Sequence, residues 1–281
     1  MRRTTTAIVT ALSAAVIAGA GPAIGSVAGT PAGANAARAT TVNMEAVIKA
    51  AMWDPYKPNQ KITPGSGPSV KKVEKALSAK GYLAKKYVDG HFGTSTVSAY
   101  ARYQKALGYR GLAASGLPGK GSLATLGKGR YKLTRIISVG AKTTMDGKTV
   151  NKRTAKMIRA AQKRAGVNFR LTQGSYHPGT GASAGTHDGG GVVDISVHGL
   201  PSVKGAVKAL RQVGFAAWHR LPSQGPWAAH IHAVAISDTD MSPAAQAQAG
   251  GYFKGRNGLA NNGKDHGPKV KKVTWEEYKR R

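Results

Sequence analysis

Apolar residues recur at helical spacing in the first part of the chain. One such pattern covers residues 70 to 77, and Gly81 follows it where a helix is expected to end. A second pattern predicts a helix from about residue 94 to 107, with Thr94 as its cap and Gly108 as its stop. The aromatic side chains of this region match the spacing of a buried stripe and are expected to be core residues: Phe92, Tyr100 and Tyr103.

The second part of the chain combines helical and strand periodicity. Residues 149 to 165 predict an amphipathic helix that ends at Gly166, and residues 167 to 171 then alternate between apolar and polar types, as in a half-buried strand. Further strands are expected at residues 192 to 197, 215 to 218 and 230 to 236, with a helix at residues 203 to 213. These patterns predict an α+β domain built on an antiparallel sheet with flanking helices.

The segments between these patterns set the expected domain boundaries. Residues 40 to 68 hold two isolated apolar anchors, Met52 and Trp53, followed by a turn-rich stretch of prolines and glycines. A basic, turn-rich stretch near residues 127 to 132 separates the two parts. We therefore expect a lead-in linker at residues 37–68, a small helical domain at residues 69–128, and a larger domain with a basic tail at residues 129–281.

The first residues have the pattern of a secretory signal. Arg2 and Arg3 precede a short apolar run, and Ala-x-Ala sequences between residues 34 and 39 offer cleavage sites. Because the run is short and interrupted by glycine, no membrane span is expected to remain in the mature protein. We expect residues 1–36 to be removed and the protein to be secreted.

The charge of the chain restricts its partners. It has 42 lysines and arginines against 12 aspartates and glutamates, a formal net charge of +30, so a polyanionic partner is expected. Nucleic acid, an anionic membrane surface and the phosphate polymers of a bacterial wall all meet this requirement. No specific nucleic acid is expected, because the basic residues are scattered and no nucleic-acid-binding motif is present.

The turn between the first two predicted helices carries a motif. Its pattern is Asp-Gly-x-Phe-Gly-x-x-Thr, followed by a Tyr-Gln pair, and a weaker Gly-Leu-Pro-Gly turn comes later. The stretch from about residue 69 to 126 thereby resembles the small three-helix peptidoglycan-binding domain of cell-wall hydrolases. The resemblance implies that this domain binds peptidoglycan, and it rests on Asp89, Gly90, Phe92, Gly93, Thr96, Tyr103 and Gln104.

Two predicted strands present side chains that bind metals. Asp194 lies on the strand face opposite its densest apolar neighbours, and His187 precedes it across a glycine run that can bend the backbone sharply. His230 and His232 share one face of the last strand. The chain has no cysteine, so histidines and carboxylates are its strong metal ligands. A catalytic Zn²⁺ takes three protein ligands, which predicts a site of His187, Asp194 and one of the two strand histidines.

The remaining strand histidine is expected to act as an acid or base. The four glutamates of the chain lie outside the strand-rich core of the second domain, so none is expected to be the general base. Histidine, with an unperturbed pKa of about 6.5, is the natural substitute. The glutamates are Glu45, Glu74, Glu276 and Glu277.

These spacings resemble those of the metallopeptidase superfamily of lysostaphin-type enzymes, D-alanyl-D-alanine peptidases and the hedgehog signalling domain. The shared pattern is His-x6-Asp followed later by His, and it covers roughly residues 150 to 236. The resemblance implies that His187, Asp194 and His232 bind zinc and that His230 is the catalytic base. Gly185 and Ala229 stand where the carboxypeptidase branch has Ser and Glu.

Together the two resemblances imply a wall-associated zinc metallopeptidase that hydrolyses an amide bond of peptidoglycan peptide. The carboxypeptidase type and the endopeptidase type share these residues, so both stay open. Peptidoglycan and anionic wall polymers are the expected partners, and a monomer is the expected state. Candidate substrate contacts near the predicted cleft are Gln173, Ser175 and Trp227.

Two alternatives stay open at this point. One is a non-catalytic peptidoglycan-binding protein whose zinc site is structural or vestigial, as the hedgehog resemblance permits. The other is a basic binder of nucleic acid or membrane, which predicts an affinity that depends steeply on salt and is indifferent to chelators. Neither alternative accounts for the spacing of the histidines and the aspartate.

Overall fold

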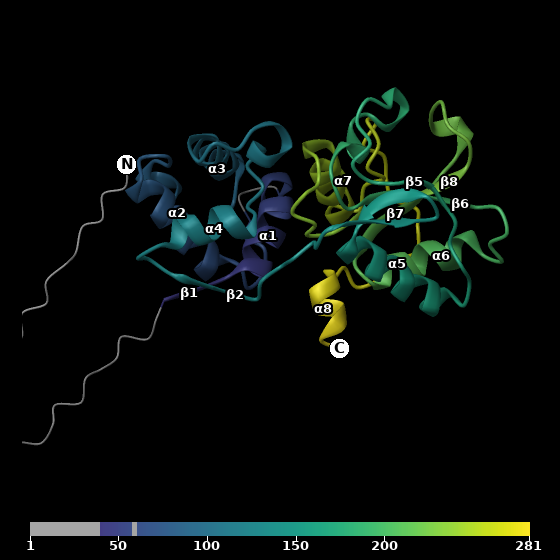
Figure 1. Ribbon diagram of the computed structural model, residues 1–281, viewed down its shortest axis with the longest axis horizontal. Coiled ribbons are helices and arrows are strands. Elements are labelled where there is room, and N and C mark those ends of the chain that lie inside the picture. The colour runs from purple at the N-terminus through teal and green to yellow at the C-terminus, as the bar shows by residue number, and fades with distance from the viewer. Residues whose placement is uncertain (1–39, 58–60) are drawn as a thin grey trace, which may run out of the picture. The chain divides into compact units, whose positions relative to one another are not determined.

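A computed structural model describes residues 40–57 and 61–281 of the chain (Figure 1). The expected signal segment at residues 1–36 lies outside these ranges. The described residues belong to one compact unit. Within them, no helix combines the length and the apolar character that crossing a membrane requires.

The first part of the described chain is mainly helical, as predicted. Residues 69–128, the expected small domain, hold three α-helices, and their aromatic residues Phe92, Tyr100 and Tyr103 are buried in one core. Strands β1 and β2 pair in parallel, which brings the two ends of this part side by side. The elements are β1 (Thr41–Asn43), α1 (Met44–Trp53), α2 (Gly67–Ala79), α3 (Thr94–Ala106), α4 (Lys120–Gly127) and β2 (Lys132–Thr134).

The described part of the segment expected to be a lead-in linker contains a buried helix instead. Helix α1 places Met52 and Trp53 in the core, and the ring of Trp53 stacks on Phe253 with centroids 4.4 Å apart. Asp54, which follows α1, accepts a hydrogen bond from the backbone N–H of Phe92 at 3.1 Å. The prediction of a linker is wrong because it took the apolar anchors of an amphipathic helix for isolated residues.

Buried acceptors hold the Asp-Gly turn that precedes α3. Glu74 of α2 accepts hydrogen bonds from the backbone N–H of Gly90 at 2.8 Å and from the hydroxyl of Thr96 at 3.0 Å. Gln104 of α3 accepts a hydrogen bond from the backbone N–H of Gly116 in the second turn at 2.9 Å. Because buried polar groups need partners, these bonds fix both turns against the helices. The motif residues therefore organise the domain from within.

The second part of the chain mixes helices and strands, and its main sheet is antiparallel, as predicted. Strands β3 and β4 form a hairpin, and four further strands pair in the order β5-β6-β8-β7 with every neighbouring pair antiparallel. The strands are β3 (Lys142–Met145), β4 (Lys148–Asn151), β5 (Leu171–Gln173), β6 (Val192–Ser196), β7 (Phe215–Arg220) and β8 (His230–Ala235). The helices are α5 (Lys152–Ala165), α6 (Val203–Gln212), α7 (Pro243–Phe253) and α8 (Trp275–Lys279).

Three predicted boundaries are wrong for local reasons. The helix expected from residue 149 begins at Lys152, because the side chain of Asn151 accepts a hydrogen bond from the backbone N–H of Thr154 at 2.8 Å and caps α5. The strand expected at residues 167 to 171 begins only at Leu171. Thr94 is the first residue of α3 rather than its cap, since the cap position is Gly93 and no side chain bonds there.

The four-stranded sheet has one apolar face and one face that carries polar groups. Val193 and Ile195 of β6 belong to a core that they share with α5 and α6, and these two helices lie on the same side of the sheet (Figure 1). The alternate residues Asp194 and His232 point to the other face, since successive strand residues point in opposite directions. Helix α7 contacts β7 and β8.

The basic C-terminal tail is anchored to the second part of the chain. Helix α8 places Trp275 in the core shared with α5 and α6, and the carboxylate of Glu276 accepts hydrogen bonds from the guanidinium of Arg153 at 2.9 and 2.8 Å. Burial alone raises the pKa of Glu276, but the hydrogen bonds and charge of Arg153 outweigh it and hold that pKa below its ordinary value. The ion pair thus fastens α8 to the first turn of α5.

Replacing Glu276 with Ala is expected to lower the free energy of unfolding by about 3–5 kcal/mol, because it leaves the buried Arg153 without its counter-ion. The double variant Arg153→Met/Glu276→Leu is expected to lose much less, since it buries no lone charge. Urea unfolding of both variants beside the wild-type protein measures this difference. Equal losses in the two variants would show that the side chains matter only through packing.

Candidate functional site

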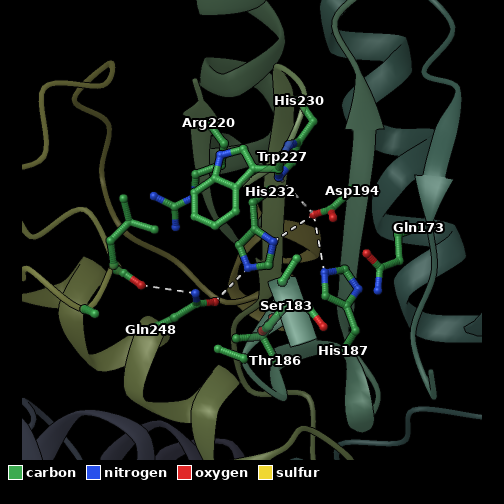
Figure 2. A pocket seen from close by; sticks show the side chains of 15 residues that line it. Gln173, Ser183, Thr186, His187, Asp194, Arg220, Trp227, His230, His232 and Gln248 are labelled. Carbon is green, nitrogen blue, oxygen red and sulfur yellow. Dashed lines mark hydrogen bonds and ion pairs between the residues drawn. The ribbon is translucent and has the colours of Figure 1, made fainter. Parts of the chain in front are cut away.

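One row of side chains crosses the polar face of the main sheet. Gln173 of β5 pairs with Asp194 of β6, Asp194 pairs with His232 of β8, and His232 pairs with Trp218 of β7. Residues directly opposite each other on an antiparallel pair share one face and lie close together. The register of the sheet therefore sets Asp194 beside His232, as Figure 2 shows.

His187 reaches the same point from a turn that precedes β6. It lies in a short 3-10 helix, Thr186–Asp188, and the glycine run after it leads the chain directly into β6. One ligand atom each of His187, Asp194 and His232 lies within 4.8 Å of the others. The structure thus brings together all three residues that were expected to bind zinc.

The orientation of the His187 ring is fixed by a backbone carbonyl. Nδ1 lies 2.8 Å from the carbonyl oxygen of Gly174, so it carries the proton and donates it to that oxygen. Nε2 then holds the lone pair, and it is buried and has no hydrogen-bond partner in the described structure. It lies 3.4 Å from Oδ1 of Asp194. A cation between these two atoms satisfies both of them.

The orientation of the His232 ring is fixed from α7. Nε2 of His232 lies 2.7 Å from Oε1 of Gln248, and Nε2 of Gln248 donates to the carbonyl of Gly258 at 3.1 Å. This second bond identifies which end of the amide is the oxygen, so His232 donates through Nε2 and keeps a lone pair on Nδ1. Figure 2 shows this chain of bonds beside the cavity.

A conflict follows for His232, because its Nδ1 lies 2.8 Å from Oδ1 of Asp194. A neutral imidazole has one N–H and cannot donate to Gln248 and Asp194 together. Full protonation is disfavoured, since burial lowers the pKa of His232 despite the nearby Asp194. Burial alone raises the pKa of Asp194, but the close approach of His187 and His232 outweighs this and holds that pKa well below its ordinary value. An ionised carboxylate that faces two imidazole lone pairs is a site for a cation.

The donor set favours one class of cation. Two imidazole nitrogens and one carboxylate oxygen match the three protein ligands of a catalytic zinc site, whereas calcium and magnesium take oxygen ligands. The second ring nitrogen of each histidine is engaged by a carbonyl or amide oxygen, as is usual around bound metals. His187, Asp194 and His232 therefore fit Zn²⁺.

His230 lies beside this group but is oriented differently. Its Nδ1 lies 2.8 Å from the carbonyl oxygen of Ala228 and donates to it, which leaves the lone pair on Nε2. That nitrogen is 3.7 Å from Oδ1 of Asp194, and the side chain lines the cavity with 15% of its surface exposed. His230 is thus the most accessible imidazole of the site and presents a free proton acceptor to it.

These groups open into a cavity of about 260 Å³. Gln173 and Trp227, both expected to contact substrate, line it, and Nε2 of Gln173 is buried without a hydrogen-bond partner in the described structure. Among the described residues that line the cavity, Asp194 is the one with a carboxylate. The glutamates lie elsewhere, as the sequence predicted, and Asp188, the carboxylate next to His187 in the chain, lines a different hollow.

The prediction for Ser175 is wrong. Its hydroxyl is buried, accepts a hydrogen bond from the backbone N–H of Val192 at 3.1 Å, and donates to the carbonyl of Val192 at 2.7 Å. Ser175 therefore ties the strand end after β5 to the start of β6, and it does not line the cavity. Its role is to hold the glycine turn that positions His187.

The sequence did not predict two residues of the site, Gln248 and Arg220. Gln248 lies in an Ala/Gln-rich stretch to which no role was given, and Arg220 follows Trp218 and His219 at the end of β7. Both line the cavity. Strand periodicity places Arg220 on the face of Trp218, but nothing local indicates that this face meets α7.

A family model for a peptidoglycan binding domain matches residues 66–126. This match supports the expected peptidoglycan-binding domain and with it a cell-wall context. It covers the turns that Glu74 and Gln104 hold, and it ends before the part of the chain that carries the histidine cluster. No curated protein and no solved structure matches the chain.

Replacing Gln248 with Leu is expected to weaken zinc binding by about 10- to 100-fold, because it removes the acceptor that fixes the His232 ring. Glu at the same position keeps an acceptor and is expected to retain most of the affinity. Competition with a chromophoric chelator measures both values. The matched control is Gln246→Leu, which changes a second glutamine of α7, a buried one that donates to the carbonyl of Met241. Equal affinities in the Gln248→Leu and control variants would contradict this role.

Proposed function

We propose that the chain is a zinc-dependent hydrolase of an amide bond in the peptide of bacterial peptidoglycan, of carboxypeptidase or endopeptidase type. One observation carries the proposal: one ligand atom each of His187, Asp194 and His232 lies within 4.8 Å of the others at a cavity, with a free imidazole nitrogen of His230 alongside. A bound Zn²⁺ supplies Lewis acidity toward a carbonyl and a water of lowered pKa.

The three histidines around this point suit two different roles, metal ligand and general base. His187 and His232 each use their second ring nitrogen to hold their orientation. His230 instead points its unprotonated Nε2 into the cavity, where it can take a proton from the attacking water and return it to the leaving amine. No other described residue lining the cavity offers a comparable base, because Asp194 is one of the three proposed metal ligands.

The remaining walls fit a peptide. Nε2 of Gln173 is a buried donor without a partner in the described structure, and a substrate carbonyl at the cavity satisfies it. Trp227 is held in place by a hydrogen bond from its Nε1 to the carbonyl of Leu221 at 3.0 Å, and its ring meets that of His230 edge-on with centroids 6.2 Å apart. It offers an apolar wall beside the proposed base.

The peptidoglycan-binding domain supports the proposed substrate class. A binding domain on the same chain keeps the cavity near an insoluble polymer and raises the effective substrate concentration. The formal net charge of +30 acts in the same direction toward the anionic wall. Both features increase encounter with the wall without altering the chemical step.

Purified protein is expected to bind one zinc ion and to release new amino groups from peptidoglycan, and a chelator is expected to abolish the release until zinc is restored. Mass spectrometry of the digested peptides identifies the bond that is cut. Stoichiometric zinc without hydrolysis of peptidoglycans of differing peptide composition would overturn the proposal and favour a wall-binding protein with a structural zinc site.

Replacing His230 with Ala is expected to lower kcat by about 10²- to 10⁴-fold while zinc stays bound, because the variant loses the base and keeps the three ligands. The matched control is His198→Ala, which removes an exposed imidazole that does not line the cavity. Metal content and single-turnover rates are measured on both proteins. A fall in zinc content in His230→Ala would assign that residue to the metal instead.

A further inference from the structure

Arg220 is a buried cation without a counter-ion. Its side chain is 2% exposed, and its Nη1 donates to the carbonyl of Asn257 at 2.6 Å. Its Nη2 is buried and has no hydrogen-bond partner within the described part of the chain. The guanidinium lies over the ring of Trp218, 4.8 Å from its centroid. It is therefore held rigidly with one end unsatisfied.

The carboxylates near Arg220 are engaged elsewhere. Asp194 is shared among the histidines, and Asp265 accepts a hydrogen bond from the buried guanidinium of Arg211 at 2.9 Å. Burial lowers the pKa of Arg220 to about 10, and the charges of Asp194 and Asp265 offset only part of this. A buried charge without a partner is unfavourable, and folds keep such groups mainly at sites of function.

Arg220 lines two hollows at once. One is the cavity of about 260 Å³ that holds the histidine cluster, and the other is a groove of about 590 Å³. The groove also carries cationic and titratable side chains, while its carboxylate, Asp265, is already paired with Arg211. Those side chains are Lys204, His219, Lys264 and His266.

The segment between the two hollows keeps Arg220 in place. Asn257 and Gly263 line the groove, whereas Gly258 to Ala260 line the cavity. A Cβ atom on Gly258 would lie 3.0 Å from the Trp218 ring and 3.5 Å from Nη2 of Arg220, so the backbone passes directly against the guanidinium. The carbonyl of Gly258 also accepts the bond from Gln248. The metal-binding group and Arg220 are thus braced by the same loop.

We infer that Arg220, together with the basic groove, forms a subsite for a carboxylate of the peptide stem, next to the amide that is cut. This inference rests on the proposed function and specifies its substrate. A carboxylate is the favoured ligand because the position adjoins the reacting centre, where a group of the same peptide lies. A carboxylate on the cut peptide can lie beside that centre, and a guanidinium binds a carboxylate through charge-assisted hydrogen bonds.

The test compares a synthetic stem pentapeptide, L-Ala-γ-D-Glu-L-Lys-D-Ala-D-Ala, with two derivatives. One derivative carries an amide at the C-terminus and the other at the α-carboxylate of D-Glu. Calorimetry on zinc-loaded His230→Ala protein measures binding without turnover. One of the two amidations is expected to weaken binding by about 10- to 100-fold, as expected for a lost charge-assisted hydrogen bond. In the background of Arg220→Gln, the same amidation is expected to have no effect.

Further variants separate charge from structure. Arg220→Lys keeps the charge and is expected to retain part of the preference for the free acid. Lys204→Gln alters an exposed residue of the groove, cannot disturb the core, and is expected to reduce that preference about two- to fivefold. The control is Arg159→Gln, which removes one exposed positive charge from α5 and is expected to change nothing.

The outcomes distinguish this inference from the proposed function. If wild-type protein hydrolyses the free acid and both amides equally, the subsite is overturned and the hydrolase stands. If no peptide is cut but Arg220-dependent preference for the acid is measured, the subsite stands and the hydrolase fails. If glycerol phosphate binds through Arg220 while neither amidation matters, the groove serves phosphate and the inference is wrong.

Discussion

The arrangement of the site depends on where two imidazole protons are held. His187 donates a hydrogen bond from Nδ1–H to the carbonyl of Gly174, and His232 donates one from Nε2–H to Gln248, so both lone pairs face the carboxylate of Asp194. Three electron-rich atoms then share one small volume, and none can neutralise another. This is why the cluster is consistent with a divalent cation, and why the orienting groups matter as much as the ligands.

The backbone turn before β6 is shaped by close approach. A Cβ on Gly189 would lie 2.2 Å from the carbonyl oxygen of Asp240, and one on Gly190 would lie 2.6 Å from the hydroxyl of Tyr176. Gly191 has a positive φ of 80° and packs against Asp238 in the same way. Any larger residue here would push His187 away from Asp194. The glycines were expected to allow a sharp bend. In the structure they mainly allow neighbouring atoms to approach the backbone closely.

Much of the site follows from period-two alternation, which is a local property. It placed Asp194 on the polar face of β6 and paired His230 with His232 on β8, and the structure has both. The resemblance at residues 69–126 is confirmed by the family match to residues 66–126. The role of Gln248 could not be predicted from the sequence, because it depends on the packing of α7 against the sheet. Helix α1 was missed because its apolar residues are followed by prolines and glycines, which were taken as signs of a linker.

The charges of the proposed metal ligands and of Arg220 act together at the site. Two neutral imidazoles and one carboxylate would balance only half the charge of a divalent cation bound there, and Arg220 adds a further positive charge on β7, the strand next to β8. With such a cation bound, the potential in the cavity of about 260 Å³ would be positive, because little water fits there to screen the charges. Such a site would favour a substrate that brings its own negative charge, and under the proposed function it would stabilise the charge that develops on a carbonyl oxygen under attack. The chain has 12 acidic residues against 42 basic ones, and this excess of positive charge favours negatively charged partners at the surface. Arg220 has the same effect at the cavity.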